Sequence, residues 1–230
     1  MHASPAGRID MRIGQQACWW LLLAAPFYLN DFASIFVKGW HAWLIIDYSA
    51  VKLLPLLLIG WLLHTRRMTA QQFGWVRQSP AAFIVVFVSM TLVGTLLDQN
   101  GYRLLDSAGG YRRLGGMPTI DSPLVNWIDL TLGLALVALL EEMIFRGALH
   151  SLLARLTGSK VAIVGAGALA FGLIHWSGGL HAVLVTGTIG AIFMAAYLRT
   201  RSVQALVLAH FSVNFIDFSG VIPKSLFKLL

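Results

Sequence analysis

Long apolar runs separated by short polar stretches set the pattern of this chain. A membrane-spanning helix needs about 20 mostly apolar residues, and the sequence offers runs of this kind at residues 17–37, 43–63, 80–97, 124–149, 161–176, 180–198 and 203–218. The last four are short or carry polar residues, as expected of helices that line an interior polar site. No repeat or linker divides the chain. The pattern therefore predicts an all-α fold, a polytopic transmembrane helical bundle of seven to eight spans that forms one integral membrane domain over residues 1–230.

Composition supports a membrane protein. The chain is 57% hydrophobic and 12% charged, whereas soluble domains are typically about 45–50% apolar and about 25% charged. The net charge of +7 comes from basic residues between the apolar runs, where they would meet anionic headgroups. We therefore expect membrane lipid as a partner and no nucleic acid. The single cysteine excludes an intramolecular disulfide and a cysteine-ligated zinc site.

The distribution of basic residues between loops predicts the orientation, because cytoplasmic loops carry an excess of lysine and arginine. If the N-terminus is cytoplasmic, nine basic residues fall inside and six outside. The inner ones are Arg8, Arg12, Arg66, Arg67, Arg77, Arg155, Lys160, Arg199 and Arg201, and the outer ones are Lys38, Arg103, Arg112, Arg113, Lys224 and Lys228. We therefore expect a protein integral to the plasma or inner membrane with a cytoplasmic N-terminus.

Two features invite a functional reading that we do not favour. Asp47 and Lys52 are charged residues within the second apolar run, but they are five apart, beyond the best i,i+4 pairing distance. Snorkelling at a helix end explains them adequately. The longest connection, residues 98–123, is rich in glycine and proline. It could be a flexible cap, but we expect a plain solvated loop.

The end of the fourth run carries two adjacent acids, Glu141 and Glu142, with Arg146 close behind. A charge within hydrocarbon costs about 2.5 to more than 10 kcal/mol at the bilayer centre, so an intramembrane ionisable pair is a functional-site hypothesis. Glu142 and Arg146 are i,i+4 and share a helical face, which predicts a structural ion pair. Glu141 points about 100° away and would be free to act on a substrate or a water.

Three more polar residues lie on the later apolar runs: His175 on the fifth, and His210 and Asn214 on the seventh. Each alone fits a structural role, such as an interhelical hydrogen bond worth about 0.6–2 kcal/mol. Together with Glu141 they occupy three separate helices of an apolar bundle, which predicts that they turn toward one another. A carboxylate base, two imidazoles and an amide can activate water and stabilise an oxyanion, as peptide-bond hydrolysis requires.

These residues resemble the signature motifs of a known family. Glu141-Glu142-x-x-x-Arg146, Phe171-x-x-x-His175 and His210-x-x-x-Asn214 are similar, in order and spacing, to the three motifs of the CPBP intramembrane proteases. This is the Abi/CAAX-protease group, similar to the Rce1-type CAAX prenyl endopeptidases. The resemblance covers about residues 124–218 and implies that this part is the catalytic core.

The resemblance implies a bundle of eight or nearly eight helices, with catalytic groups inside the membrane and open toward the cytoplasmic side. An eighth helix would then be hidden, for example in the tail from Val221, unless that tail is an interfacial segment. The resemblance also implies that Glu141 is the general base, assisted by His175. His210 and Asn214 would form the oxyanion hole.

In the same reading Glu142 and Arg146 orient the site. The family has been described as metal-dependent and as glutamate-type. In the first case Glu141, His175 and His210 would bind zinc, because His₂Glu is a known catalytic ligand set. No His-Glu-x-x-His spacing occurs here, so we favour the metal-free glutamate reading with no cofactor.

The sequence thus predicts an intramembrane endopeptidase that acts on a membrane-associated or lipidated peptide or protein. Two other functions stay open at this point. One is a non-catalytic scaffold or immunity protein that keeps the polar pocket for stability or ligand binding. The other is a proton-coupled transporter, since buried glutamate and histidine also form proton relays, although the inverted repeats of many transporters are not visible. The substrate, its prenylation and the oligomeric state are not predicted.

Overall fold

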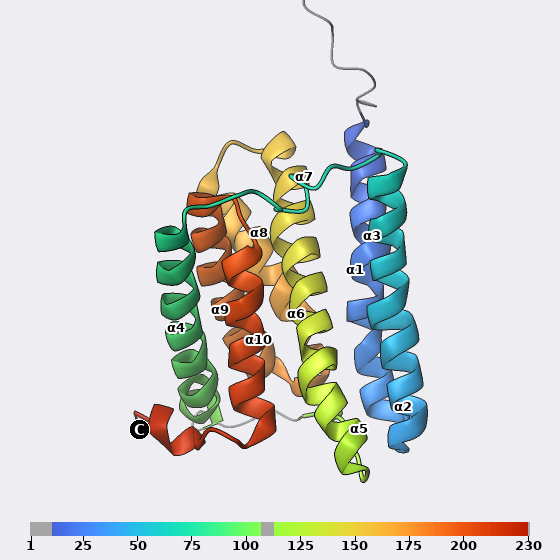
Figure 1. The fold of residues 1–230 in the computed structure, drawn as a ribbon, viewed down its shortest axis with the longest axis vertical. Helices are drawn as coiled ribbons and strands as arrows, with labels where there is room; N and C mark the ends of the chain where they lie inside the picture. Colours follow the sequence, from blue (N-terminus) through green and yellow to red (C-terminus); the bar gives the residue numbers. More distant parts are fainter. Residues whose placement is uncertain (1–10, 107–112, 230) are drawn as a thin grey trace, which may run out of the picture.

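The computed structural model describes residues 11–106 and 113–229. In these residues every regular element is a helix, and the helices stand roughly parallel or antiparallel in one bundle (Figure 1). The prediction of an all-α fold is therefore confirmed for the described part of the chain. Arg8 and Arg112 lie outside it.

The helices run between two ends of the bundle and are joined by short connections. In chain order they are α1 (Ile13–Phe36), α2 (Trp40–Ile46), η1 (Asp47–Leu53), α3 (Leu54–His64), α4 (Pro80–Asp106), α5 (Pro123–Ile128), η2 (Asp129–Gly133), α6 (Leu134–Glu142), η3 (Met143–Ala148), α7 (Leu149–Leu156), α8 (Lys160–Leu173), η4 (Trp176–Gly178), α9 (Leu180–Thr200), α10 (Gln204–Ser219) and η5 (Lys224–Phe227). The stretches from α2 to α3 and from α5 to α7 are each helical without a break.

By length and hydropathy, three helices of the described residues are candidate membrane spans: Trp40–His64, Pro80–Tyr102 and Leu180–Thr200. Lys160–Leu173 is apolar but shorter. The total of seven to eight spans stays a prediction. As far as the structure describes the tail from Val221, to Leu229, its one helix is the single-turn η5, which is far too short to span. The expectation of an eighth helix there is therefore wrong.

Three π-helical segments, η1, η2 and η3, interrupt the two composite helices. A π-helix bonds residue i to i+5, is rare, and is frequently found at functional sites. In η1 this geometry brings Asp47 and Lys52 together, so that the ammonium of Lys52 pairs with a carboxylate oxygen of Asp47. Both are 3% exposed. Our reading of these two residues as snorkelling helix ends is wrong, because it assumed α-helical spacing.

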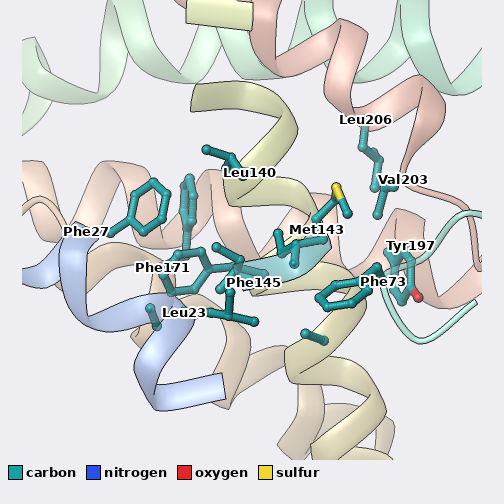
Figure 2. Close-up of a cluster of buried hydrophobic side chains, with 14 of the residues drawn as sticks. Leu23, Phe27, Phe73, Leu140, Met143, Phe145, Phe171, Tyr197, Val203 and Leu206 are labelled. Atoms are coloured by element: carbon teal, nitrogen blue, oxygen red, sulfur yellow. The ribbon is translucent and has the colours of Figure 1, made fainter. Parts of the chain in front are cut away.

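The core surrounds the segment that carries the acidic pair (Figure 2). Phe145 is fully buried, and its ring meets those of Trp20, Phe27, Tyr28 and Phe171 edge to face at 5.9–6.3 Å between centroids. Such aromatic pairs add about 0.5–1.5 kcal/mol each beyond their buried area. The apolar face of η3 thus anchors α1 and α8 against the helix that bears Glu141 and Glu142.

The bundle has two opposite ends, which we name for the chain termini. The N-terminal end holds the start of α1 and the connections at residues 65–79, 157–159 and 201–203; the first of these crosses the end from α3 to α4 (Figure 1). The backbone N–H of Val203 donates to the carbonyl of Gly74 (2.9 Å) and ties two of these connections together. The C-terminal end holds residues 113–122, the turn after α8, and the C-terminal tail.

Candidate functional site

Glu142 joins two elements of the site. Its Oε1 accepts a hydrogen bond from Nδ1 of His210 on α10 (2.8 Å), and its Oε2 lies 3.2 Å from Nε of Arg146 one turn later. Glu142 is fully buried and Arg146 is 1% exposed. A buried carboxylate is stable only when it is paired and hydrogen-bonded. The ion pair expected from the i,i+4 spacing is therefore present, and it also receives an imidazole.

Glu141 points away from that pair, as the helical period predicts. Its Oε2 lies 3.7 Å from Nε2 of His210, beyond hydrogen-bond length. The side chain is 8% exposed, and among the described residues Oε2 has no hydrogen-bond partner. One imidazole thus faces both acids, bonded to Glu142 through one nitrogen and near Glu141 with the other.

His175 lies just beyond the end of its helix, not within it. α8 ends at Leu173, and the backbone then turns through η4. The sequence placed His175 inside a run extending to Trp176, which is wrong, because Gly178 and Gly179 follow and the chain reverses there. Nδ1 of His175 lies 3.2 Å from the carbonyl oxygen of Phe171. A carbonyl only accepts, so Nδ1 carries the proton in this bond and Nε2 can accept another.

Phe171 organises the remaining groups. Its ring lies edge-on to the rings of His175 (5.4 Å) and His210 (5.9 Å), and the guanidinium of Arg146 sits 3.9 Å from its centroid. Cation–π contacts of this kind are favourable when desolvated. Within the described part of the chain, the two terminal nitrogens of Arg146 have no hydrogen-bond partner. They are therefore two buried pairs of donors in need of an acceptor.

A cavity of about 680 Å³ connects these side chains. Glu141, Arg146, His175, His210 and Asn214 line it. Asn214 lies one turn after His210 on α10 and is half-buried. The fully buried Glu142 lies behind this lining layer and reaches the cavity through His210 and Arg146. The structure thus brings all the residues singled out in the sequence into one site.

Three charged residues that line this cavity were not predicted from the sequence to belong to the site. Asp47 and Lys52 line it from η1, and the neighbouring Tyr48 donates a hydrogen bond to Asp129 of η2 (3.0 Å). Asp31 also lines it, and its Oδ2 accepts from the backbone N–H of Ser177 (2.6 Å), which fixes the turn after His175. The signal available in the sequence was the presence of charges in apolar runs, which are rare and often functional.

The cavity reaches the C-terminal end of the bundle, where the exposed residues Arg113 and Lys224 line it. The backbone N–H of Leu114 donates to the carbonyl of Ser177 (2.7 Å) and that of Gly116 to Ser34 (3.2 Å). Residues 113–117 therefore form part of the wall, which corrects the reading of this connection as a plain solvated loop. The residues 107–112 lie outside the described chain.

The position of the cavity bears on two of our expectations about orientation in the membrane. The start of α1 lies at the N-terminal end of the bundle (Figure 1), and the cavity reaches the surface at the opposite end, beside Arg113 and Lys224. A cytoplasmic N-terminus and a site open toward the cytoplasm therefore cannot both hold for this structure. The excess of basic residues favours the first, and the resemblance implied the second.

The three side chains named as possible zinc ligands are not gathered around one point in the described structure. In residues 11–106 and 113–229, no group of three histidine, cysteine, aspartate or glutamate side chains is arranged to hold a metal ion. Nδ1 of His210 is bonded to Glu142, and Nδ1 of His175 to a carbonyl, which leaves the two Nε2 atoms as the nitrogens that could bind a metal ion.

Comparison with known proteins shows that the part of the chain that holds this site is similar to one family. A family model described as Type II CAAX prenyl endopeptidase Rce1-like matches residues 123–216. No curated protein and no solved structure matches the chain. The matched stretch begins at the first residue of α5 and contains both acids, Arg146, both histidines and Asn214. Residues 123–216 of this chain are therefore similar to the Rce1-like CAAX prenyl endopeptidases of the CPBP family.

Proposed function

We propose that this protein is an intramembrane endopeptidase in which Glu141 activates a water molecule. The observation that carries the proposal is the position of Oε2 of Glu141, which is buried, borders the cavity and has no hydrogen-bond partner among the described residues. A buried polar atom without a partner calls for water or a ligand. The family match supports hydrolysis as the chemistry.

One water can contact both Glu141 and His210. The distance between Oε2 of Glu141 and Nε2 of His210 is 3.7 Å, which is less than two hydrogen-bond lengths of about 2.8 Å placed end to end. A water at the apex of that triangle would face the cavity. The free Nε2 of His175 would accept a hydrogen bond from the same water or its neighbour, and this is the assisting role we assign to it.

Asn214 and His210 would stabilise the oxyanion. Oxyanion donors act by meeting the charge that develops in the transition state, and loss of one typically costs about 10²–10³ in kcat. Nδ1 of His210 is bonded to Glu142, so Nε2 is the ring nitrogen that would donate to the oxyanion, beside the amide of Asn214.

The reaction then needs no group beyond these side chains and water. The water oxygen attacks the scissile carbonyl carbon while Glu141 takes one proton, and the carbonyl electrons move onto the oxygen held by Asn214 and His210. Collapse of this intermediate breaks the C–N bond, and Glu141 passes its proton to the leaving nitrogen. The products are a new carboxyl group and a new amine.

The substrate we propose is a membrane-associated or lipidated peptide that enters from the C-terminal end of the bundle. The volume of about 680 Å³ lies within the usual range of about 300–1,000 Å³ for ligand sites. Apolar Phe171, Phe193 and Ile189 line the cavity alongside the polar groups, which suits a segment with hydrophobic side chains.

Purified protein tests the proposal directly. Glu141→Gln keeps the size of the side chain and removes the base, so cleavage of a panel of prenylated, acylated and unmodified membrane peptides should fall by about 10²–10⁴. The matched control is Asp121→Asn, an acid-to-amide change at an exposed residue outside the cavity lining. Equal cleavage by Glu141→Gln and wild type, with both folded, would exclude this role. A non-catalytic scaffold would then become the better reading.

A further inference from the structure

A second cavity lies at the opposite, N-terminal end of the bundle and is strongly basic. Its volume is about 740 Å³, and four arginines line it: Arg66, Arg67, Arg155 and Arg201. They come from the α3–α4 connection, from α7 and from the end of α9. Helices distant in sequence therefore bring four positive charges to one pocket at the surface of the bundle.

Among the described residues, these arginines have no carboxylate beside them in the pocket. No aspartate or glutamate lines it among the described residues, and in that part of the chain none of the four arginines forms an ion pair. The connections at residues 64–80, 150–160 and 199–204 contain no acid at all. Four like charges repel one another when no counter-ion lies between them. Binding of an anionic ligand would therefore stabilise the pocket.

Two of the arginines hold a backbone conformation that favours glycine. Arg66 (φ 56°) and Arg201 (φ 59°) are the non-glycine residues with positive φ in the described chain. Each ends a helix: the N–H of Arg66 donates to the carbonyl of Leu63 (3.1 Å), and that of Arg201 to Tyr197 (2.7 Å). Glycine is the usual residue at such positions because it carries no Cβ. Backbone strain of this kind clusters at ligand sites, and both of these arginines line the same pocket.

Further contacts fix three of the four guanidinium groups in place. A terminal nitrogen of Arg201 bonds Nε2 of His150, a residue that is 3% exposed. Arg155 donates to the carbonyl of Met11 (2.8 Å) and to Oε1 of Gln16 (2.9 Å). The guanidinium of Arg67 stacks on the ring of Trp61 at 4.8 Å. Side chains held in this way lose little freedom when they bind a ligand.

We propose that this pocket binds a phosphate group, supplied by an anionic phospholipid headgroup or by a soluble phosphate. Guanidinium groups match phosphate oxygens with paired N–H donors, and basic pockets between transmembrane helices bind anionic headgroups. The pocket is separate from the cavity that holds Glu141, which opens at the other end of the bundle. It would therefore hold its ligand during catalysis without competing with the substrate.

Direct binding to the full-length protein in detergent tests this proposal. The ligands are dihexanoyl-phosphatidylglycerol, dihexanoyl-phosphatidylcholine and inorganic phosphate at constant ionic strength, read as dissociation constants from ligand-induced shifts in Tm. The test variant is Arg66→Gln with Arg201→Gln. The control is Arg77→Gln with Arg199→Gln, which removes the same charge from exposed residues at the same end but outside the pocket lining.

We expect phosphatidylglycerol to bind more tightly than phosphatidylcholine, and the test variant to weaken it about 100-fold, at about tenfold for each charged hydrogen bond lost. Binding of inorganic phosphate with the same loss would instead assign the pocket to a soluble phosphate. Arg66→Gly separates folding from binding, because it relieves the backbone: it should raise the Tm of the ligand-free protein and still weaken binding. Equal effects of the test and control variants, or no binding of any anion, would overturn the proposal.

Discussion

Nδ1 of His210 lies 2.8 Å from Oε1 of Glu142, and this contact ties α10 to the end of α6 across 68 positions of sequence. The bond orients an imidazole whose other nitrogen faces Glu141. The two adjacent acids therefore have different contacts. Glu142 bonds His210 and pairs with Arg146, and these three residues form a framework that joins α10 to α6, whereas Glu141 borders the cavity. Two residues of the same type acquire different roles because a helix turns them in different directions.

The first prediction concerns the stability of this framework. Glu142→Gln should destabilise the protein by about 3–5 kcal/mol, because it leaves the buried guanidinium of Arg146 without its counter-charge. Glu141→Gln should change stability much less, since it removes a carboxylate that has no hydrogen-bond partner on Oε2 among the described residues. The Tm of the two variants in the same detergent measures the difference. Similar values of Tm would contradict the division between the two acids.

The buried pair in η1 leads to a second prediction. Lys52→Met alone should destabilise the protein by about 3–5 kcal/mol, because Asp47 would remain as an unpaired buried charge. The double variant Asp47→Leu with Lys52→Met should recover most of this loss, since an apolar pair of similar volume is often neutral. Additive losses in the double-mutant cycle would show that the two side chains do not form the contact described here.

A third prediction tests the close packing next to the acidic pair. A Cβ on Gly147 of η3 would overlap the backbone of Phe73, whereas one on Gly165 of α8 would meet nothing within 4 Å. Gly147→Ala should therefore cost about 1–3 kcal/mol through overpacking. Gly165→Ala should stabilise its helix by about 0.5–1 kcal/mol. Thermal unfolding of both variants gives the comparison, and a neutral Gly147→Ala would refute the close approach of residues 65–79 to η3.

A fourth prediction addresses the metal question. Under the metal-free mechanism, dialysis against a strong chelator should leave the rate of cleavage unchanged, and added Zn²⁺ should not restore or raise it. A metal-dependent enzyme would lose activity with the chelator and regain it with Zn²⁺. Metal analysis of the active protein by mass spectrometry provides a readout that does not depend on the substrate. Stoichiometric zinc that leaves together with activity would overturn the glutamate mechanism.

A fifth prediction concerns orientation. With Cys18 replaced by serine, single cysteines at Ser159 and Ser225 would report the N-terminal and C-terminal ends of the bundle, since both positions are exposed. The excess of basic residues predicts that an impermeant maleimide labels intact cells at Ser225→Cys and labels Ser159→Cys only after lysis. The reverse pattern would place the mouth of the Glu141 cavity on the cytoplasmic side.

The sequence alone was enough to predict the helical fold, one ion pair of the site and the family that the chain resembles. Long apolar runs force helices, because an unpaired backbone group in hydrocarbon costs several kcal/mol, and the ends of the runs lie within a few residues of most helix ends. The i,i+4 spacing of Glu142 and Arg146 likewise predicted their pairing. Three short motifs indicated the family over nearly the stretch that the family model matches.

Tertiary structure decided what local spacing could not. The pairing of Asp47 with Lys52 required a π-helical turn, which depends on packing and has no clear sequence signal. The bond from His210 to Glu142, the position of His175 beyond its helix and the wall formed by residues 113–117 depend on contacts between distant segments. The four arginines at the opposite end appear in the sequence as separate loop charges. Only the fold gathers them, because it brings the ends of α3, α7 and α9 to the same end of the bundle.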